Sequence, residues 1–342
     1  MSPGNREDLL LLVASLYYEH DHNQQEIADR LRLNRSNVSR LLKEAKNKGL
    51  VEIRIHRTVA TVPELEREMV TRFGLQHAMV TDNRGNDYSS TLAAAGRLAA
   101  QYLEAILHTG DVMGISWGTG VSAAVSAFAG NPSLQVEVVQ MIGSVGTIDS
   151  VIDGPELARQ LAMKLGGRYY YLHAPLFVDS PTVRDALIEQ STIGDTLKRA
   201  RRASVGLVGI GTTEAGASSF LRAGHLTEEQ LAILRSQGVV GETAGQHFDI
   251  EGEAAPYDIN QRVIGISLDD LKCIPHVVAV ACGLKKKLGI FGALHGGLVK
   301  AIATDAETAQ AVLEVDELHR ADRLNTNVRD NGAVKRTPAT GD

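Results

Sequence analysis

Polar and basic side chains occupy one face of a short segment near the N-terminus. At about 100° per residue, a helix over residues 35–47 separates its apolar residues from its polar ones. The apolar face holds Val38, Leu41, Leu42 and Ala45, and the polar face holds Ser36, Arg40, Lys43 and Asn47. Hydroxyl, amide and guanidinium donors on one helix face can contact base edges and phosphates in the major groove of DNA. The same pattern also fits an amphipathic helix whose polar face is only solvated.

A glycine-rich turn further along the chain has the chemistry of an anion site. Residues 114–121 read GISWGTGV, which predicts the end of a strand, a turn and the start of a helix. Small residues let backbone N–H groups converge on an anion, and Ser116 and Thr119 add hydroxyl donors at the positive end of the helix. Such turns are common without a ligand, so the turn by itself is a weak signal.

Short helices are expected to position the N-terminal polar face. Asn34 is a good N-cap for the helix that carries the polar face, and it leaves N–H groups at the helix start that can donate hydrogen bonds to a DNA phosphate. The small side chain of Ala28 permits the preceding helix to approach closely. Apolar periodicity predicts the three helices over residues 9–18, 24–31 and 35–47.

Two further elements are expected between the N-terminal helices and the alternating strands and helices that begin at about residue 78. Residues 50–56 alternate apolar and polar side chains after Gly49, which predicts a small wing or edge strand. A linker helix over residues 64–73 is expected to end at Gly74.

From about residue 78 apolar strands alternate with glycine-rich turns and amphipathic helices. This alternation predicts an α/β domain with a parallel sheet covered on both faces, whose ligands bind at the carboxyl ends of the strands. The expected strands are 78–81, 112–116, 136–142, 169–172, 205–210, 263–266 and 277–281.

Charge and composition fit a DNA-binding protein of the cytoplasm. The net charge is −6 over 342 residues, but residues 24–57 hold nine Lys and Arg against four Asp and Glu, so this segment is +5 and the remainder −11. A small basic segment on an acidic body is what local contact with a polyanion requires. No apolar run is long enough to span a bilayer, no export signal is evident, and the two cysteines are too few for a disulfide framework.

The N-terminal segment resembles the DNA-binding domain of the SorC family of sugar-responsive bacterial regulators. The resemblance rests on residues 16–19, 23–31, 34–42 and 49–51. It implies a winged-helix-like helix-turn-helix domain that binds double-stranded operator DNA. The residues expected to contact DNA are Gln24, Gln25, Asn34, Arg35, Ser36, Asn37, Ser39, Arg40 and Lys43.

The resemblance to the SorC family continues to about residue 314 and implies a Rossmann-like domain that senses a small phosphorylated sugar or polyol. The family usually has Thr at the position of Gly120, which leaves Ser122 as a possible replacement donor. In register with the family, Lys286 is the ligand-facing lysine. The effector-binding residues expected from the turn and the resemblance are Ser116, Gly118, Thr119, Gly120, Gln140, Gly211, Glu242, Gln246, Asp249 and Lys286.

Effector binding is expected to be reversible. Some family members hold an aldehyde sugar phosphate as a Schiff base on a strand lysine, and this chain has Ile142 at that place. No catalytic residue, metal site or cofactor is expected. The alternative is a sugar-phosphate isomerase or deaminase, because the family's sensing domain resembles such enzymes. The sequence contains no HExxH, GxSxG or Walker-type motif, and an enzyme has no use for a basic helix-turn-helix.

These expectations divide the chain into four parts. Residues 1–58 form the DNA-binding domain, 59–76 the linker helix, 77–318 the effector-binding domain and 319–342 a disordered tail. A homo-oligomer, a tetramer as the resemblance implies, is expected because one small reading head contacts too few bases for strong specificity.

Overall fold

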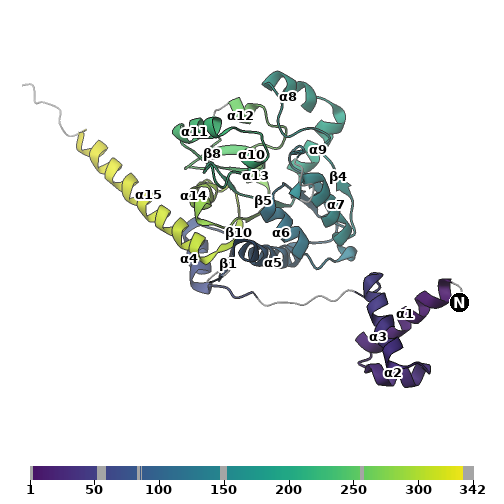
Figure 1. The fold of residues 1–342 in the computed structure, drawn as a ribbon. Helices are drawn as coiled ribbons and strands as arrows, with labels where there is room; N and C mark the ends of the chain where they lie inside the picture. The colour runs from purple at the N-terminus through teal and green to yellow at the C-terminus, as the bar shows by residue number, and fades with distance from the viewer. Residues whose placement is uncertain are drawn as a thin grey trace, which may run out of the picture. The chain divides into compact units, whose positions relative to one another are not determined.

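The computed structural model describes residues 3–51, 59–82, 85, 87–146, 152–254 and 258–333. Within it the chain forms two compact units, residues 1–58 and 59–342. Figure 1 shows both units.

Among its described residues, the N-terminal unit contains three helices around one small core. They are α1 (Pro3–Tyr18), α2 (Gln24–Leu31) and α3 (Arg35–Asn47). The second and third have the bounds that the sequence predicts, because polar caps define their starts: Asn23 forms a capping box with Glu26, and the Asn34 side chain accepts a hydrogen bond from the Asn37 amide at 2.7 Å. Most of the predicted wing strand, residues 52–56, lies outside the described residues.

The core of this unit comes from the predicted apolar faces. Its ten buried residues are Leu10, Val13, Ala14, Leu16, Ile27, Ala28, Val38, Leu41, Leu42 and Ala45. Arg32 ends α2 in the left-handed region, at φ 53°, and Leu33 of the turn packs against the core. An ion pair between Arg6 and Glu44 joins α1 to α3.

The larger unit is an α/β domain with a parallel sheet of seven strands. The strand order is β1-β10-β9-β5-β2-β3-β4. These strands are β1 (His77–Thr81), β2 (Val112–Ile115), β3 (Glu137–Gln140), β4 (Tyr169–Tyr170), β5 (Val205–Gly209), β9 (His276–Val280) and β10 (Ala301–Asp305). From β2 the chain proceeds to β3 and β4 on one side, whereas β9 and β10 lie beyond β5 on the other. The order therefore reverses between β2 and β5, where α/β sheets bind ligands.

Helices cover both faces of this sheet (Figure 1). The helices of this unit in the described residues are α4 (Pro63–Phe73), α5 (Tyr88–Ile106), α6 (Thr119–Ala127), η1 (Pro132–Leu134), α7 (Gly154–Leu165), α8 (Pro181–Ile188), α9 (Ser191–Arg201), α10 (Ser219–Arg222), α11 (Glu228–Ser236), α12 (Asp258–Gln261), α13 (Leu268–Cys273), η3 (Leu284–Lys286), α14 (Lys287–His295) and α15 (Ala306–Ala333).

Alternate residues of the strands enter two separate cores. In β9, Val278 and Val280 pack in the core with α5, α6 and α7, while Val277 and Ala279 pack in the core with α9, α13 and α14. This alternation is the consequence of the two-residue side-chain period of a strand. The near-continuous apolar strands of the sequence are thus explained by burial on both faces.

Four features of the domain differ from the sequence expectations. Residues 263–266 form only isolated bridges, from Val263 to Phe177 and from Gly265 to Ile142, instead of a strand of the main sheet. The strand β10 was not expected, nor was a small antiparallel sheet of β6 (Gly211–Thr212), β7 (Val239–Thr243) and β8 (Gln246–Asp249). The tail expected to be disordered from residue 319 is instead helical through Ala333, because α15 continues. Among the residues searched, no helix is long and apolar enough to cross a membrane.

Candidate functional site

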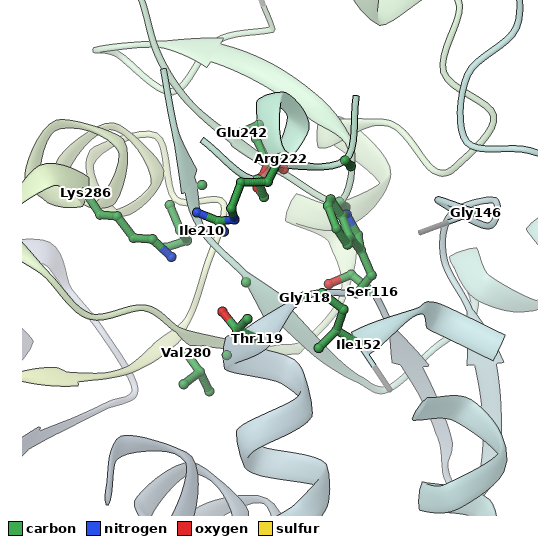
Figure 2. A pocket seen from close by; sticks show the side chains of 17 residues that line it. Ser116, Gly118, Thr119, Gly146, Ile152, Ile210, Arg222, Glu242, Val280 and Lys286 are labelled. Atoms are coloured by element: carbon green, nitrogen blue, oxygen red, sulfur yellow. The ribbon is translucent and has the colours of Figure 1, made fainter. Parts of the chain in front are cut away.

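A cavity of about 480 Å³ lies at the carboxyl ends of β2, β5 and β9 (Figure 2). It is therefore at the point where the strand order reverses. Seven of the ten residues expected to bind an effector line it: Ser116, Gly118, Thr119, Gly120, Gly211, Glu242 and Lys286.

The start of α6 forms one wall of the cavity. Gly118 is its N-cap at φ 107°, a conformation that favours glycine, and no side chain caps the helix there. The first N–H groups of α6 therefore remain available to a ligand. Gly120 packs closely against β9, since an added Cβ would lie 2.3 Å from the carbonyl oxygen of Val280. Glycine at this position is thus required by packing, and Ser122 is not among the lining residues.

Lys286 enters the cavity from the opposite side. It ends η3, whose position is fixed at both ends by hydrogen bonds. The Gly283 amide donates to Asp305 Oδ2 at 3.0 Å and to Thr308 Oγ1 at 2.8 Å. The Thr212 hydroxyl donates to the carbonyl oxygen of Lys285 at 2.9 Å. Burial lowers the pKa of the Lys286 ammonium, while nearby Glu242 opposes this shift.

Glu242 is the buried carboxyl group of the cavity, with 7% of its surface exposed. Ser219 Oγ donates a hydrogen bond to its Oε1 at 3.1 Å. Burial raises the pKa of Glu242 to about 7, although Ser219 and the charge of Lys286 both act to lower it. The carboxyl is therefore poised to exchange a proton near neutral pH.

The sequence did not indicate two other cavity residues. Arg222, at the end of α10, lies between Glu242 and Lys286 in Figure 2 and adds a second cation. Trp117, the only tryptophan, also lines the cavity and packs edge-to-face on Phe220 at a ring distance of 5.9 Å. Arg222 is on a four-residue helix, which is too short for a periodic pattern, so the only signal in the sequence was the positive charge of its side chain.

Three residues expected to contact the effector do not line the cavity: Gln140, Gln246 and Asp249. Gln140 Oε1 accepts a hydrogen bond from the Leu172 amide at 3.0 Å, and its Nε2 is buried without a hydrogen-bond partner. Asp249 Oδ1 accepts from the amides of two residues of the following turn, each at 3.0 Å. The Gln140 and Asp249 side chains therefore bind main-chain amides of neighbouring segments.

The expected DNA-contacting residues cluster on α2 and α3. Arg35, Ser36, Ser39, Arg40 and Lys43 are exposed along α3. The Asn34 side chain is occupied as the N-cap and also accepts a hydrogen bond from Ser36 Oγ at 2.8 Å.

Three of the expected DNA-contacting residues have amide side chains on α2 and α3. Arg40 donates a hydrogen bond to the side chain of Asn37, which is partly buried. Gln24 is partly buried and Gln25 is exposed at the start of α2, where Gln25 Nε2 donates to Asp29 Oδ1 at 2.9 Å.

Comparison with known proteins decides the family. Residues 58–314 match the family described as "Putative sugar-binding domain", and residues 10–60 match the MarR family of DNA-binding domains. The chain belongs to the SorC family of transcriptional regulators. It is 30% identical over 308 residues to the deoxyribonucleoside regulator of Bacillus subtilis, covering 90% of this chain and 98% of that protein.

A second relative and a solved structure match this chain over a similar length. The sorbitol operon regulator of Klebsiella pneumoniae is 29% identical over 314 residues, covering 91% of this chain and 99% of that protein. The crystal structure of this full-length regulator superposes with a TM-score of 0.71 over 90% of this chain and 98% of that one. The chain is therefore a DNA-binding regulator with a sugar-binding domain, and the alternative of an isomerase or deaminase is not favoured.

The buried carboxyl of this SorC-family protein predicts a pH-dependent stability. The folded-state pKa of about 7 lies above the ordinary value of 4.5, so folding favours the protonated form. The protonated Glu242 carboxyl therefore contributes its full share to the free energy of unfolding below pH 4.5, and this contribution is lost as the pH rises to about 7. From pH 5 to pH 8 we expect the free energy of unfolding of Glu242→Gln to rise by roughly 1–2 kcal/mol relative to that of the wild type. This is less than the value calculated from the pKa shift alone, because Lys286 loses its charged neighbour in the variant.

Urea denaturation at several pH values measures this effect. Glu253→Gln is the matched control, because the Glu253 carboxylate is 67% exposed and forms an ion pair with Lys272. Parallel pH profiles for wild type and Glu242→Gln would contradict the assignment.

Proposed function

We propose that the cavity binds a small phosphorylated sugar or polyol, and that this effector controls the affinity of the regulator for operator DNA. The observation that carries the proposal is the arrangement of positive groups around one cavity. The Lys286 side chain extends from η3 and the Arg222 side chain from α10, with their nitrogen atoms directed toward each other, and the uncapped start of α6 lies below them in the view (Figure 2). Cationic side chains and free N–H groups are the donors that a phosphate requires.

The remaining polar groups suit the hydroxyls of a sugar. Ser116 and Thr119 offer hydroxyl groups, and Glu242 accepts hydrogen bonds in the carboxylate form or donates one when protonated. The main chain of Gly209 and Gly211 also lines the cavity. A cavity that combines a few polar groups with apolar walls such as Trp117 and Ile210 is typical of a small-molecule site.

Binding is proposed to be reversible and non-covalent. Ile142 replaces the lysine with which some family members form an imine, and Ile142 is buried in the core, outside the cavity lining. No cofactor is required for this mode of binding.

The DNA-binding unit is proposed to act through α3 in the major groove. Ser36, Asn37 and Arg40 would contact bases, while Arg35 and Lys43 would contact phosphates. Gln24, Gln25, Asn34 and Ser39 would add contacts at the helix starts and along α3. Two such units per operator require a homo-oligomer, which we propose is a tetramer acting in the cytoplasm.

A thermal screen with sugar phosphates tests the function. At a concentration of about 100 Kd, the cognate sugar phosphate should raise Tm by roughly 5 °C, because ligand binding to the folded state stabilises it. The same ligand should change the affinity for DNA fragments that the protein has selected from a random pool, and it should be recovered unchanged. The unphosphorylated sugar is the matched control. Turnover of a stabilising ligand would favour an enzyme, and stabilisation without any change in DNA affinity would contradict control by the effector.

A further inference from the structure

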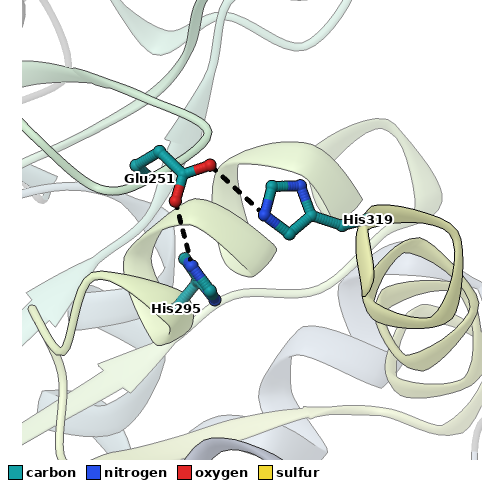
Figure 3. A group of neighbouring side chains, drawn as sticks. All are labelled: Glu251, His295 and His319. Atoms are coloured by element: carbon teal, nitrogen blue, oxygen red, sulfur yellow. Dashed lines mark hydrogen bonds and ion pairs between the residues drawn. The ribbon is translucent and has the colours of Figure 1, made fainter. Parts of the chain in front are cut away.

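A second cluster of functional side chains lies outside the effector cavity (Figure 3). Glu251 follows β8, His295 is the last residue of α14 and His319 is on α15. Glu251 Oε2 lies 3.1 Å from His295 Nε2, and Glu251 Oε1 lies 3.2 Å from His319 Nε2. One ligand atom from each residue lies within 4.8 Å of the others. Three segments that are distant in the sequence therefore meet at one point.

Ion pairing alone does not satisfy these groups. His319 Nε2 is buried from solvent, and its contact with Glu251 does not have hydrogen-bond geometry. A buried imidazole nitrogen without a hydrogen bond costs free energy unless another partner satisfies it. Arg323 is the other cation near this carboxylate, and its closest nitrogen is 3.8 Å from Glu251 Oε2. A cation between the imidazole rings and the carboxylate would satisfy all three.

The surroundings favour a defined position for such a cation. The buried ring of Phe291 stacks on His295 at a centroid distance of 5.3 Å and lies 5.2 Å from His319. The two histidine rings are 5.1 Å apart. Both histidines are on helices, and their side chains are only 28% and 17% exposed. An apolar wall and rigid elements limit the positions available to the ligands and reduce competition from water.

We propose that Glu251, His295 and His319 form a binding site for a divalent transition-metal ion of the zinc type. Two imidazole nitrogens and one carboxylate oxygen are a ligand set that zinc accepts. In a tetrahedral zinc site with bonds of about 2.1 Å, neighbouring ligand atoms are about 3.4 Å apart. One ligand atom of each residue already lies within 4.8 Å of the other two, so small side-chain rotations would bring them to the ion. Water would occupy the fourth position.

The ion would fasten α15 to the rest of the larger unit. His319 lies beyond residue 314, where the match to the sugar-binding domain ends. Metal binding to the folded chain stabilises it, because the ligands are brought together only by folding.

Zinc titration of the full-length protein, after removal of metals with a chelator, tests the site. Calorimetry should show one saturable site per chain that is lost in the His295→Gln, His319→Gln double variant. Zinc at about 100 Kd should raise the Tm of the wild type by roughly 5 °C. Each single His→Gln variant should bind zinc at least about tenfold more weakly.

His108→Gln is the matched control, because the His108 side chain is 84% exposed and lies outside the cluster. This variant should bind zinc as tightly as the wild type. Circular dichroism of the metal-free variants separates loss of the site from loss of the fold. Absence of saturable zinc binding by the wild type would overturn the proposal. Equal affinity of the wild type and the double variant would also overturn it and leave an ion-pair cluster only.

Discussion

Replacing both Arg40 and Lys43 with alanine is expected to lower operator affinity by about 100-fold. A bidentate arginine contact to a base contributes about 1–3 kcal/mol, and a phosphate contact adds to this sum; each 1.4 kcal/mol is a tenfold change in affinity. Both side chains are exposed, and neither belongs to the ten-residue core of the N-terminal unit. The double variant should therefore keep its fold while it loses contacts to DNA.

The single variants separate the two roles. Arg40→Ala should weaken binding to the selected operator more than to unrelated DNA, because a base contact carries sequence information. Lys43→Ala should weaken both and reduce the slope of log affinity against log salt by about 1. Lys198→Ala removes one exposed charge from the other unit and is the control for net charge. Unchanged operator affinity in the double variant would show that α3 does not read DNA.

The accurate parts of the sequence prediction rest on patterns within consecutive residues. The bounds of α2 and α3 are as predicted, because their caps and their apolar periodicity lie within one short segment. The parallel α/β domain was also predicted, since strands buried on both faces have near-continuous apolar sequences. The helix over residues 64–73 similarly ends at Gly74, which adopts φ 65°.

The elements that were missed depend on contacts between distant residues. The strand β6 has only two residues and pairs with β7, which follows after α10 and α11. No periodic pattern is visible in so short a segment. The continuation of α15 past residue 319 is accompanied by the ion pair of Arg72 with Glu317 and the hydrogen bond from Arg320 to the carbonyl oxygen of Arg72, across 248 positions of the sequence. A polar composition alone suggested disorder there.

The same reasoning explains the partial prediction of the cavity. The glycine-rich turn after β2 was recognisable, because its chemistry is contained in consecutive residues. Arg222 reaches the cavity because the fold brings α10 close to the glycine-rich turn, which no sequence pattern indicates. The Asp249 side chain accepts hydrogen bonds from main-chain amides of its own turn, and the residue type does not predict this role. The metal ligands proposed above are separated by 44 and 24 positions, so no sequence motif joins them.

Lys286→Met is expected to weaken binding of the cognate sugar phosphate by about 10- to 150-fold. A charge-assisted hydrogen bond to a partly buried phosphate contributes roughly 1.5–3 kcal/mol. Lys286 lines the cavity and has a pKa that burial lowers, so an incoming dianion stabilises its charged form. Lys285→Met is the adjacent control: Lys285 is exposed, does not line this cavity, and anchors η3 through its carbonyl oxygen.

Calorimetry with the best phosphate from the thermal screen measures both lysine variants. Lys285→Met should bind within about twofold of the wild type, because an exposed lysine contributes near zero at physiological salt. Equal affinities of the two variants would remove Lys286 from the effector site. Borohydride supplies an independent check, since a lysine of lowered pKa is also a better nucleophile toward an aldehyde. A borohydride-stable adduct on the wild type that is absent from Lys286→Met would show a covalent imine and contradict reversible, non-covalent binding.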